Sequence, residues 1–458
     1  MLFFCRYFLF CDILYCSIES WDIMTELIEI KKDKYESFVE NHPLKSHFLQ
    51  SYYWGEFSKK KKNLTPYYLG LFDNKELIGA CLLLQKKLPL GYSYFYSPRG
   101  FVIDFSNKEL LKNMTNKVLE FTKKHHSIFL KIDPDIIYKK YNYLDKEVAL
   151  EYNPQDIFKS LTNLGFKHLG FTKNFETMQP RYTFRVDLNN DMDTIIDHFS
   201  KTTKQRINKA KNLGVDVRIG DFSDIDEFYH LMTLTEDRKD FVSYSKDYYE
   251  EQYKLLHKQG MAELFLGSVN IDKILGKFNS DLGQVNDEIK GIDPASNSKN
   301  SKNKLKNLKD KKSKLEKDID KYKEIAEKYG NNITLNAHMI IIYGDKAWVL
   351  YAGNHNILTD TYANYLTYYK HLEYCKKKGI KIYDQFGTIG DLRGDNPRIG
   401  LHEFKKKFGG DYVEFIGEFD YIQNRFMYFI FTKLVPIYRN LVRKRSKLEV
   451  SNEVKGNK

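Results

Sequence analysis

Cysteine is scarce in this sequence, and long apolar runs are missing from it. Five cysteines in 458 residues are too few for a disulfide scaffold, and no CxxC motif or Cys/His cluster with zinc spacing occurs. No apolar run approaches the roughly 18 residues that a membrane-spanning helix needs. Only Cys81 and Cys375 lie beyond the first sixteen residues. These absences exclude a polytopic membrane protein and favour a reduced, cytoplasmic protein.

The common catalytic signatures are missing as well. The sequence has no P-loop, no dinucleotide-binding GxGxxG, no HExxH and no GxSxG, and no serine or cysteine triad is visible. We therefore expect no metal and no cofactor. Lysine, tyrosine, aspartate and glycine near strand ends remain. These residue types suit electrostatic catalysis on a phosphate-bearing substrate.

Charge and apolar content are what the sequence has in quantity. Lys plus Arg number 73 against 61 Asp plus Glu, a net charge of +12, and 42% of the residues are hydrophobic. That apolar content excludes global disorder, and the length suggests two or three domains at about 150 residues each. The basic balance favours anionic partners: nucleic acid, phosphates or a membrane surface.

Residues 1–23 do not fit the pattern that follows them. They are apolar but interrupted by Arg6, Asp12 and Glu19, without the ordered parts of a signal peptide. A membrane-interface anchor is one alternative. We prefer to take Met24 as the natural start, because it opens a strand followed by a helix. Residues 1–23 are then a non-native or disordered extension.

Two stretches of the chain alternate strands and helices in a similar order. In residues 24–155, YYLGLFD, ELIGACLLLQKKL and SYFYSPRG are typical of strands, and a helix over 108–126 precedes the strand SIFLKIDPD. In residues 156–411, a strand RYTFRVDL, a helical region ending at Gly214 and a hairpin turning at Gly344-Asp345 repeat this order. The pattern predicts an α/β fold with two modules and indicates an internal duplication.

Residues 268–330 follow a different pattern, a heptad spacing on two arms. The arms flank the Gly-, Pro-, Ser- and Asn-rich segment 291–303, which predicts an antiparallel coiled-coil hairpin inserted in the second module. The returning arm carries eleven Lys against six Asp or Glu between 301 and 330. Its basic face is either solvated surface or an arm for RNA phosphates, and the sequence leaves both open. The seam consists of Ile271, Leu275, Phe278, Leu282, Val285, Ile289, Leu305, Leu308, Lys312, Leu315, Ile319, Tyr322, Ala326 and Tyr329.

Three motifs carry candidate residues for binding an anionic substrate. Lys59 ends a helical turn in FLQSYYWGEFSKKKK, and YFYSPRGFVID places Asp104 just beyond an aromatic strand. Lys204 and Arg206, in FSKTTKQRINKAKNLGVDV, are well placed to meet a phosphate. The alternative for each is plain surface chemistry: a solvated lysine run, an edge strand with its turn, or surface cations without a role.

The fourth motif, YDQFGTIGD followed by GLHEFKKKFGG, carries the catalytic candidate. On a helix, Leu401, Phe404 and Phe408 share one face, and we expect that face to be buried. Lys405 lies on the flank of this stripe at about 40° from Leu401, whereas its two neighbouring lysines point away. A lysine beside a core stripe is a better catalytic candidate than an exposed one.

Together these motifs resemble the Fem family of non-ribosomal, aminoacyl-tRNA-dependent peptidyltransferases, with its FemA, FemX and MurM types. The similar runs are Q-x-x-x-W, Y-x-P-R-G with a following Asp, F-S-K-T-T-K-x-x-I-x-K-A-K-x-x-G-V, Y-D-Q-F-G and G-L-H-E-F-K-K-K-F-G-G. The resemblance spans nearly all of residues 24–440 and implies two tandem GNAT-like domains. The first, 24–155, is completed by about 412–458, and the second is 156–411. The hairpin at about 268–330 is a feature of the FemA and MurM types.

The resemblance also implies a reaction and roles for individual residues. An amine on the stem peptide of a peptidoglycan precursor attacks the ester of an aminoacyl-tRNA, which extends the interpeptide bridge. By resemblance, Lys405 stabilises the oxyanion and Asp104 faces the acceptor as the second catalytic residue. The family usually has Arg where this chain has Lys204, so either Lys204 or Arg206 grips the phosphate. The substrate-binding residues implied in this way are Lys59, Lys204, Arg206, Tyr96, and Tyr248 or Tyr249.

Other readings of the sequence stay open. One is a GNAT-type aminoacyltransferase with another acceptor, such as a protein amino terminus or a lipid. Another is a non-catalytic protein associated with RNA or a membrane. The tail, residues 426–448, alternates apolar and basic residues, which is typical of a segment on an anionic membrane or of a core helix with a solvated basic end. We expect a cytoplasmic protein, peripheral at the inner face of the membrane, and the sequence leaves its oligomeric state open.

Overall fold

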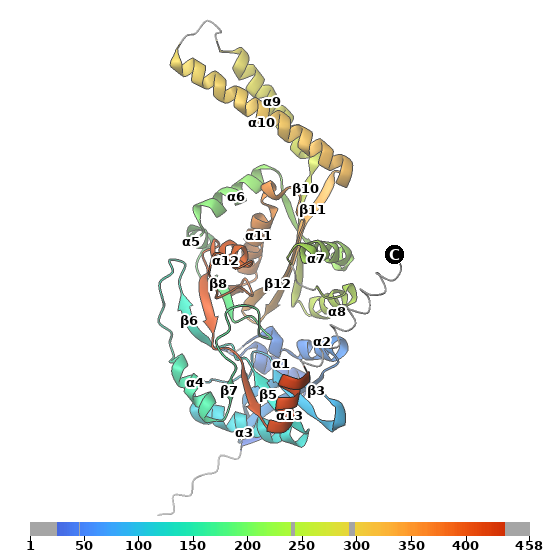
Figure 1. Cartoon of the computed structure of the whole chain (residues 1–458), viewed down its shortest axis with the longest axis vertical. Helices are drawn as coiled ribbons and strands as arrows, with labels where there is room; N and C mark the ends of the chain where they lie inside the picture. Colours follow the sequence, from blue (N-terminus) through green and yellow to red (C-terminus); the bar gives the residue numbers. More distant parts are fainter. Residues whose placement is uncertain (1–24, 45, 240–242, 293–297, 436–458) are drawn as a thin grey trace, which may run out of the picture.

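A computed structural model shows an elongated molecule with two β-sheets and a protruding pair of helices (Figure 1). The structure describes residues 25–44, 46–239, 243–292 and 298–435. Residues 1–23, taken above as an extension, lie outside these ranges, and so does most of the predicted basic tail. None of the helices within them is long and apolar enough to cross a membrane.

The first sheet lies at the lower end of the molecule in Figure 1 and has seven strands in the order β1-β2-β3-β4-β5-β15-β7. Helices α1 (Lys32–Glu40), α2 (Tyr52–Lys62), α3 (Lys108–Lys124) and α4 (Pro154–Asn163) accompany it. The strands are β1 (Thr25–Glu29), β2 (Thr65–Asp73), β3 (Glu76–Lys87), β4 (Ser93–Ser97), β5 (Ser127–Ile132), β15 (Phe419–Ile422) and β7 (Lys167–His168).

The second sheet has eight strands in the order β6-β14-β8-β13-β12-β11-β10-β9. Its strands are β6 (Ile137–Tyr141), β14 (Asp411–Phe415), β8 (Tyr182–Asp187), β13 (Ile382–Asp384), β12 (Lys346–Asn354), β11 (Asn332–Tyr343), β10 (Ala262–Asn270) and β9 (Asp216–Gly220). Its helices are α5 (Met192–Asp197), α6 (Lys201–Asn212), α7 (Ile225–Lys239), α8 (Lys246–His257), α11 (Ala363–Lys377) and α12 (Ile399–Lys406).

The two sheets repeat one arrangement. In each, a parallel pair of strands is joined through a helix: β4 to β5 through α3, and β12 to β13 through α11. The next strand across, β15 or β8, runs antiparallel to that pair. A helix between parallel strands is the usual crossover, since parallel strands cannot be joined by a tight turn. The α/β class predicted from the sequence is confirmed.

Within the described residues, the chain crosses between the sheets four times: from β5 to β6, from β6 to β7, from β7 to β8 and from β14 to β15. The first crossing leads into β6, which pairs with β14. The first and last crossings run side by side, because the Ile416 amide donates to the Ile136 carbonyl oxygen at 2.9 Å. Neither sheet is therefore built from one continuous stretch of chain.

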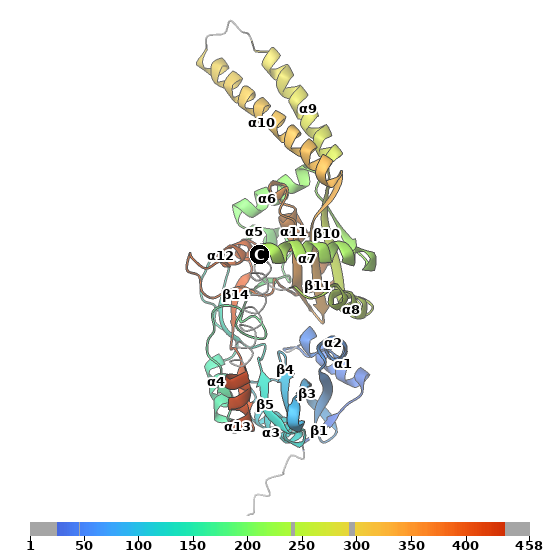
Figure 2. The same cartoon turned by 45° about the vertical axis from the view of Figure 1, so that its right-hand side comes forward.

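Helices α9 (Ile271–Lys290) and α10 (Lys299–Tyr329) lie between the paired strands β10 and β11 and extend away from the body in both views (Figures 1 and 2). They pack against each other along a line that includes Phe278 and Tyr322, whose ring centres are 5.3 Å apart. Ile271, Phe278 and Ile319, near the base, also belong to the core of the second sheet. The base of the pair is thus anchored in the body.

A buried histidine pair lies between the second sheet and α11. His338 on β11 and His371 on α11 are fully buried, and their ring centres are 5.1 Å apart. Burial lowers the pKa of His338 from 6.5 to about 3. It also lowers the pKa of His371 well below its usual value. Both rings are therefore neutral in the folded protein near pH 7.

We expect this pair to make the fold acid-sensitive. The unfolded chain binds protons near pH 6.5 and the folded chain does not, so the stabilisation is complete above that pH and is lost as the pH falls. For His338 alone, about 2 kcal/mol should disappear between pH 7 and pH 5. Urea unfolding at both pH values should show a smaller difference in His338→Asn. The exposed His230 on α7 is the control, and an equal pH dependence in wild type and His338→Asn would contradict the assignment.

Candidate functional site

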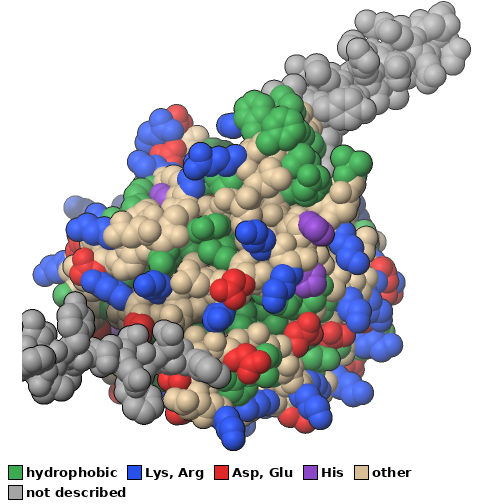
Figure 3. Space-filling model, turned by 90° about the horizontal axis from the view of Figure 1, so that it is seen from below, with side chains coloured by type: hydrophobic (Ala, Val, Ile, Leu, Met, Phe, Trp, Pro, Cys, Tyr) green, Lys and Arg blue, Asp and Glu red, His purple; other side chains and the backbone are tan. Residues whose placement is uncertain are grey.

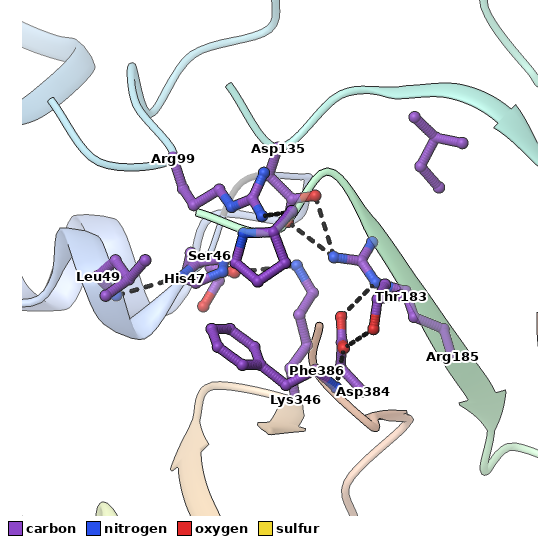
Figure 4. Close-up of polar contacts among 12 residues, drawn as sticks. Ser46, His47, Leu49, Arg99, Asp135, Thr183, Arg185, Lys346, Asp384 and Phe386 are labelled. Atoms are coloured by element: carbon purple, nitrogen blue, oxygen red, sulfur yellow. Dashed lines mark hydrogen bonds and ion pairs between the residues drawn. The ribbon is translucent and has the colours of Figure 1, made fainter. Parts of the chain in front are cut away.

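A cluster of buried charges lies where the two sheets meet, around Arg185 on β8 (Figure 4). Arg185 donates from Nε to Asp384 Oδ2 at 2.8 Å and from Nη2 to both oxygens of Asp135, at 3.0 and 3.2 Å. Asp384 ends β13, and Asp135 lies on the first crossing between the sheets. Both carboxylates are buried. We call these three residues the Arg185 cluster.

A small cavity adjoins this cluster. Its lining includes the ring of Phe415, which lies between two guanidinium groups: the Cζ atoms of Arg99 and Arg185 are 4.3 and 4.9 Å from the ring centre. His47 and Trp348, from the two halves of the chain, close another side with ring centres 4.6 Å apart. Guanidinium groups over an aromatic face are stabilised electrostatically. Arg99 and His47, from the part of the chain that forms the first sheet, therefore line a cavity whose other walls come from strands and loops of the second sheet.

The loop after β13, residues 384–387, forms another wall of the cavity. Asp384 Oδ1 accepts hydrogen bonds from the Phe386 amide at 2.7 Å and from the Thr183 hydroxyl. Phe386 has a φ of 55°, in the left-handed region that a bulky residue rarely adopts. The carboxylate of Asp384 thus helps to hold a backbone conformation that costs free energy.

Lys405 on α12 binds the far side of this loop. Its Nζ donates to the carbonyl oxygens of Phe386 and Gly387, at 2.5 and 2.6 Å, and the Gln385 side chain donates back to the Lys405 carbonyl at 3.0 Å. Burial lowers the pKa of Lys405 to about 7, although the negative charge of Asp384 acts in the opposite direction and raises it. An ammonium group has three donors, and these two carbonyl oxygens take two of them.

The chain is similar to known proteins over most of its length. The model of the FemAB family matches residues 30–435. This chain belongs to the FemAB family. A lipid II:glycine glycyltransferase of Staphylococcus aureus is 30% identical over 441 residues, covering 94% of this chain and 99% of the relative. The crystal structure of FemX superimposes with a TM-score of 0.70 at 29% identity, covering 88% of this chain and 98% of FemX.

In this FemAB protein the predicted catalytic lysine is more deeply placed than we expected. The prediction that Leu401 belongs to a buried stripe is wrong: Leu401 is 37% exposed, whereas His402 and Lys405 are buried. The inward face of α12 runs through His402 and Lys405, and the buried Phe408 lies beyond the end of the helix at Lys406. Lys405 therefore points into the protein from α12 rather than lying on the flank of an apolar face.

The predicted acceptor-facing residues of the first half lie beside β4. Tyr96 is buried and donates its hydroxyl to Asp133 Oδ2 at 3.0 Å, and Asp133 Oδ1 accepts from the Arg99 amide at 2.7 Å. Burial raises the pKa of Asp133 to about 7. Asp104 is half-buried and accepts from the Ser106 amide at 2.8 Å. Tyr96 is thus linked to Arg99, whereas no contact of Asp104 with Lys405 occurs within the described residues. Their roles stay predictions.

The predicted phosphate-binding cations lie on two helices. Lys59 is exposed on α2. On α6, Lys204 forms an ion pair with Asp197 at 2.9 Å, and Arg206 donates to the hydroxyl of Tyr365. The Cζ of Arg206 also lies 5.0 Å from the Tyr365 ring centre. The structure does not bring Lys59 into contact with either α6 residue in the ranges it describes, so a shared phosphate site stays a prediction.

The two candidate tyrosines lie on α8. Tyr248 and Tyr249 are both buried, and Tyr248 stacks on Tyr244 with ring centres 3.9 Å apart. The ring of Phe57 on α2 meets Tyr248 edge-on at 4.9 Å. Contact between α2 and α8 therefore joins the two halves of this FemAB chain here, near Lys59.

Sequence reasoning missed the Arg185 cluster and Arg99 as site residues. Arg99 and Asp384 lie inside motifs that were singled out, YSPRG and YDQFG, but neither residue was assigned a role. Arg185 had one available signal: it is a charged residue within the otherwise apolar strand RYTFRVDL. A buried charge in a strand needs a partner. No group of three or more His, Cys, Asp or Glu suited to a metal occurs among the described residues.

Proposed function

We propose that this chain transfers an amino acid from aminoacyl-tRNA to the stem-peptide amine of a peptidoglycan precursor and so builds the interpeptide bridge. The observation that carries the proposal is its 30% identity, across 94% of its length, to a lipid II:glycine glycyltransferase. Because that relative transfers glycine to lipid II, glycyl-tRNA and lipid II are the first donor and acceptor to test. The buried amine of Lys405 supports the same reaction class.

The chemistry needs few protein groups. The acceptor amine attacks the ester carbonyl carbon, the carbonyl oxygen becomes an oxyanion, and collapse expels the ribose oxygen of tRNA, which takes up the proton released by the amine. The exchange of an ester for an amide is downhill without ATP. Lys405 donates to the oxyanion, where a preorganised donor is worth most. We assign Asp104 to the acceptor side of the reaction.

The finer architecture belongs to the same proposal. We propose that the two sheets are tandem GNAT-like domains, from residues 24–155 with 412–458 and from 156–411, which exchange β6, β7 and most of β14. We also propose that 268–330 is an antiparallel coiled coil. Its support is that Phe278, Val285, Leu308, Ile319 and Tyr322, all on the heptad seam, are buried.

We propose further that the protein binds peripherally to an anionic membrane, through its C-terminal end. Figure 3 shows hydrophobic side chains gathered at one edge of the lower face, with Lys and Arg side chains nearby. On α13 (Arg425–Phe429) and the π-helical segment that follows it (Ile430–Leu434), Phe426, Phe429 and Leu434 are exposed. Exposed aromatic rings beside cations suit a membrane surface.

One experiment tests donor, acceptor and membrane together. Radiolabelled glycine on tRNA is offered to lipid II in anionic vesicles, to lipid II in neutral vesicles, and to UDP-MurNAc-pentapeptide. Label on lipid II supports the proposal, and faster labelling in anionic vesicles supports the membrane role. Label on the UDP precursor alone would move the acceptor assignment. With folded protein and competent tRNA, no label on either acceptor would favour a GNAT-type transferase with another acceptor.

The cations on α6 should affect acceptor binding and not chemistry. Lys204→Ala and Arg206→Ala should each raise the acceptor KM about tenfold, which is roughly the worth of one charge-assisted hydrogen bond. Lys59→Ala should act in the same direction, and the larger of the two α6 effects identifies the residue that grips the phosphate. The exposed Lys201 on the same helix is the matched control. If kcat alone changed, the phosphate assignment would be wrong.

A further inference from the structure

A continuous line of contacts connects the crossing between β5 and β6 to Lys405. It begins at Asp135, passes through Arg185 to Asp384, continues through the Phe386 amide, and ends where the Phe386 and Gly387 carbonyls accept from Lys405. Every contact along the line is a hydrogen bond or an ion pair. The groups come from β8, from the end of β13 and its loop, from α12 and from the β5–β6 crossing, so the contacts fix the positions of these segments relative to one another.

The middle of this line contains a residue in an unfavourable backbone conformation. Phe386 has its φ at 55°, a conformation unfavourable by roughly 1–3 kcal/mol for a non-glycine residue. Asp384 restrains it by accepting from the Phe386 amide, and Arg185 in turn fixes the carboxylate of Asp384. Loss of that restraint would let the loop relax and carry with it the two carbonyl oxygens that hold Lys405.

The cluster is a poor choice for stability alone. Burying an ion pair requires desolvation that often cancels the attraction, and apolar side chains of similar size commonly stabilise as well or better. The Arg185 side chain is only 12% exposed and those of Asp135 and Asp384 are each 4% exposed. What the cluster offers instead is direction: the guanidinium fork fixes the orientation of both carboxylates at once.

We propose that Arg185 is a positioning residue. Held between Asp135 and Asp384, it connects the loop that anchors Lys405 with the crossing between β5 and β6. The inference rests on the proposed function, since Lys405 is its catalytic group. It gives the Asp135–Arg185 contact a role in the reaction. The β5–β6 crossing leads from the first sheet, beside which Tyr96 and Asp104 lie, to the second sheet, which α12 and Lys405 accompany.

The test compares two isosteric substitutions that each remove one carboxylate charge from a buried arginine. Asp135→Asn removes one arm of the Arg185 cluster and leaves the Asp384 arm in place. Glu414→Gln removes the charged partner of Arg181, whose Nη2 forms an ion pair with Glu414. The Nη1 of Arg181 still donates to the Thr172 carbonyl and the Tyr182 hydroxyl. Arg181 lies four residues before Arg185 but forms no hydrogen bond or ion pair with the 384–387 loop in the described chain. The two variants should lose similar amounts of thermal stability.

Only Asp135→Asn should lose activity. We expect its kcat in the glycyl transfer assay to fall roughly 10–100-fold with both KM values nearly unchanged, as a misplacement of about 1 Å would cause. Arg185→Lys, which keeps the charge and loses the fork, should shift kcat in the same direction. An unchanged kcat in Asp135→Asn, or an equal fall in both isosteric variants, would overturn the proposal.

Crystal structures of the same two variants give a readout that needs no substrate. In Asp135→Asn the Lys405 amine should leave the Phe386 and Gly387 carbonyls, whereas in Glu414→Gln it should remain. An amine that stays in place in Asp135→Asn would reject the positioning role. If the wild type transferred no amino acid and Lys405 still moved in Asp135→Asn, the coupling would stand and the proposed function would fail.

Discussion

Replacing Lys405 with methionine is expected to lower the rate of amino-acid transfer roughly 10²–10³-fold, the usual effect of removing one donor to a tetrahedral oxyanion. The KM values for acceptor and aminoacyl-tRNA should change little, because the amine acts where charge develops and not where substrates bind in the ground state. Lys405 suits this role because it is buried and held by two carbonyl oxygens, which take two of the three donors of an ammonium group.

The same assignment predicts a pH dependence of kcat/KM, which reports the free enzyme. Burial lowers the pKa of Lys405 to about 7, so the amine is charged below that pH and neutral above it. A neutral amine is a weaker donor to an oxyanion, and the rate should therefore fall as the pH rises through about 7. In Lys405→Met this falling limb should be absent from whatever activity remains.

The control for both measurements is Lys407→Met, since Lys407 follows α12 directly and its side chain forms no hydrogen bond or ion pair with the 384–387 loop within the described chain. Methionine at position 405 leaves two carbonyl oxygens without their donor, which costs about 1–3 kcal/mol. Thermal melting should therefore be measured alongside the kinetics, and Lys405→Gln restores hydrogen-bond donors without the charge. Full activity in a folded Lys405→Met protein would remove Lys405 from the mechanism.

How far the sequence predicts this structure depends on how local each feature is. The helix predicted over 108–126 is α3 at Lys108–Lys124, since its apolar spacing and its Asn107 cap are contained in the segment itself. The exchange of strands between the sheets was not predictable in this way. Strand β6 has the polar sequence IYKKY, and its partner β14 is some 270 residues further along the chain. Periodicity within a segment cannot identify such a partner.

The candidate site shows the same limit. Lys405 could be singled out from its neighbours because helical geometry separates adjacent lysines. The burial of Lys405 could not be predicted, because it depends on which face of α12 packs against the protein. The sequence suggested the face with Leu401, and the structure buries the face with His402 and Lys405. The Arg185 cluster joins residues 50 and 199 positions apart, and only the fold brings them together. Spacing within motifs therefore found the lysine and missed the residues that surround it.

Shortening the helical hairpin is expected to weaken aminoacyl-tRNA binding roughly 10–100-fold at low salt while leaving the body folded. Positive charge gathers on its outer part: residues 299–314 carry eight Lys and one Asp, whereas residues 315–329 carry four Lys and five Asp or Glu. The design replaces residues 279–318 with a short Gly–Ser linker. It keeps Ile271, Phe278, Ile319 and Tyr322, which pack into the core of the second sheet.

The physical reason is counterion release, which makes lysine–phosphate binding dependent on salt. The shortened protein should therefore also show a shallower fall of tRNA affinity with salt, and its glycyl transfer should recover at high tRNA concentration. Replacing Lys302, Lys304, Lys306 and Lys309 with glutamine in the intact hairpin should reproduce most of the loss. The matched control changes four exposed lysines of α3, at the opposite end of the molecule (Figure 1): Lys108, Lys112, Lys123 and Lys124. Equal losses in both sets would show that only net charge matters, and an unchanged affinity in the shortened protein would remove the hairpin from tRNA binding.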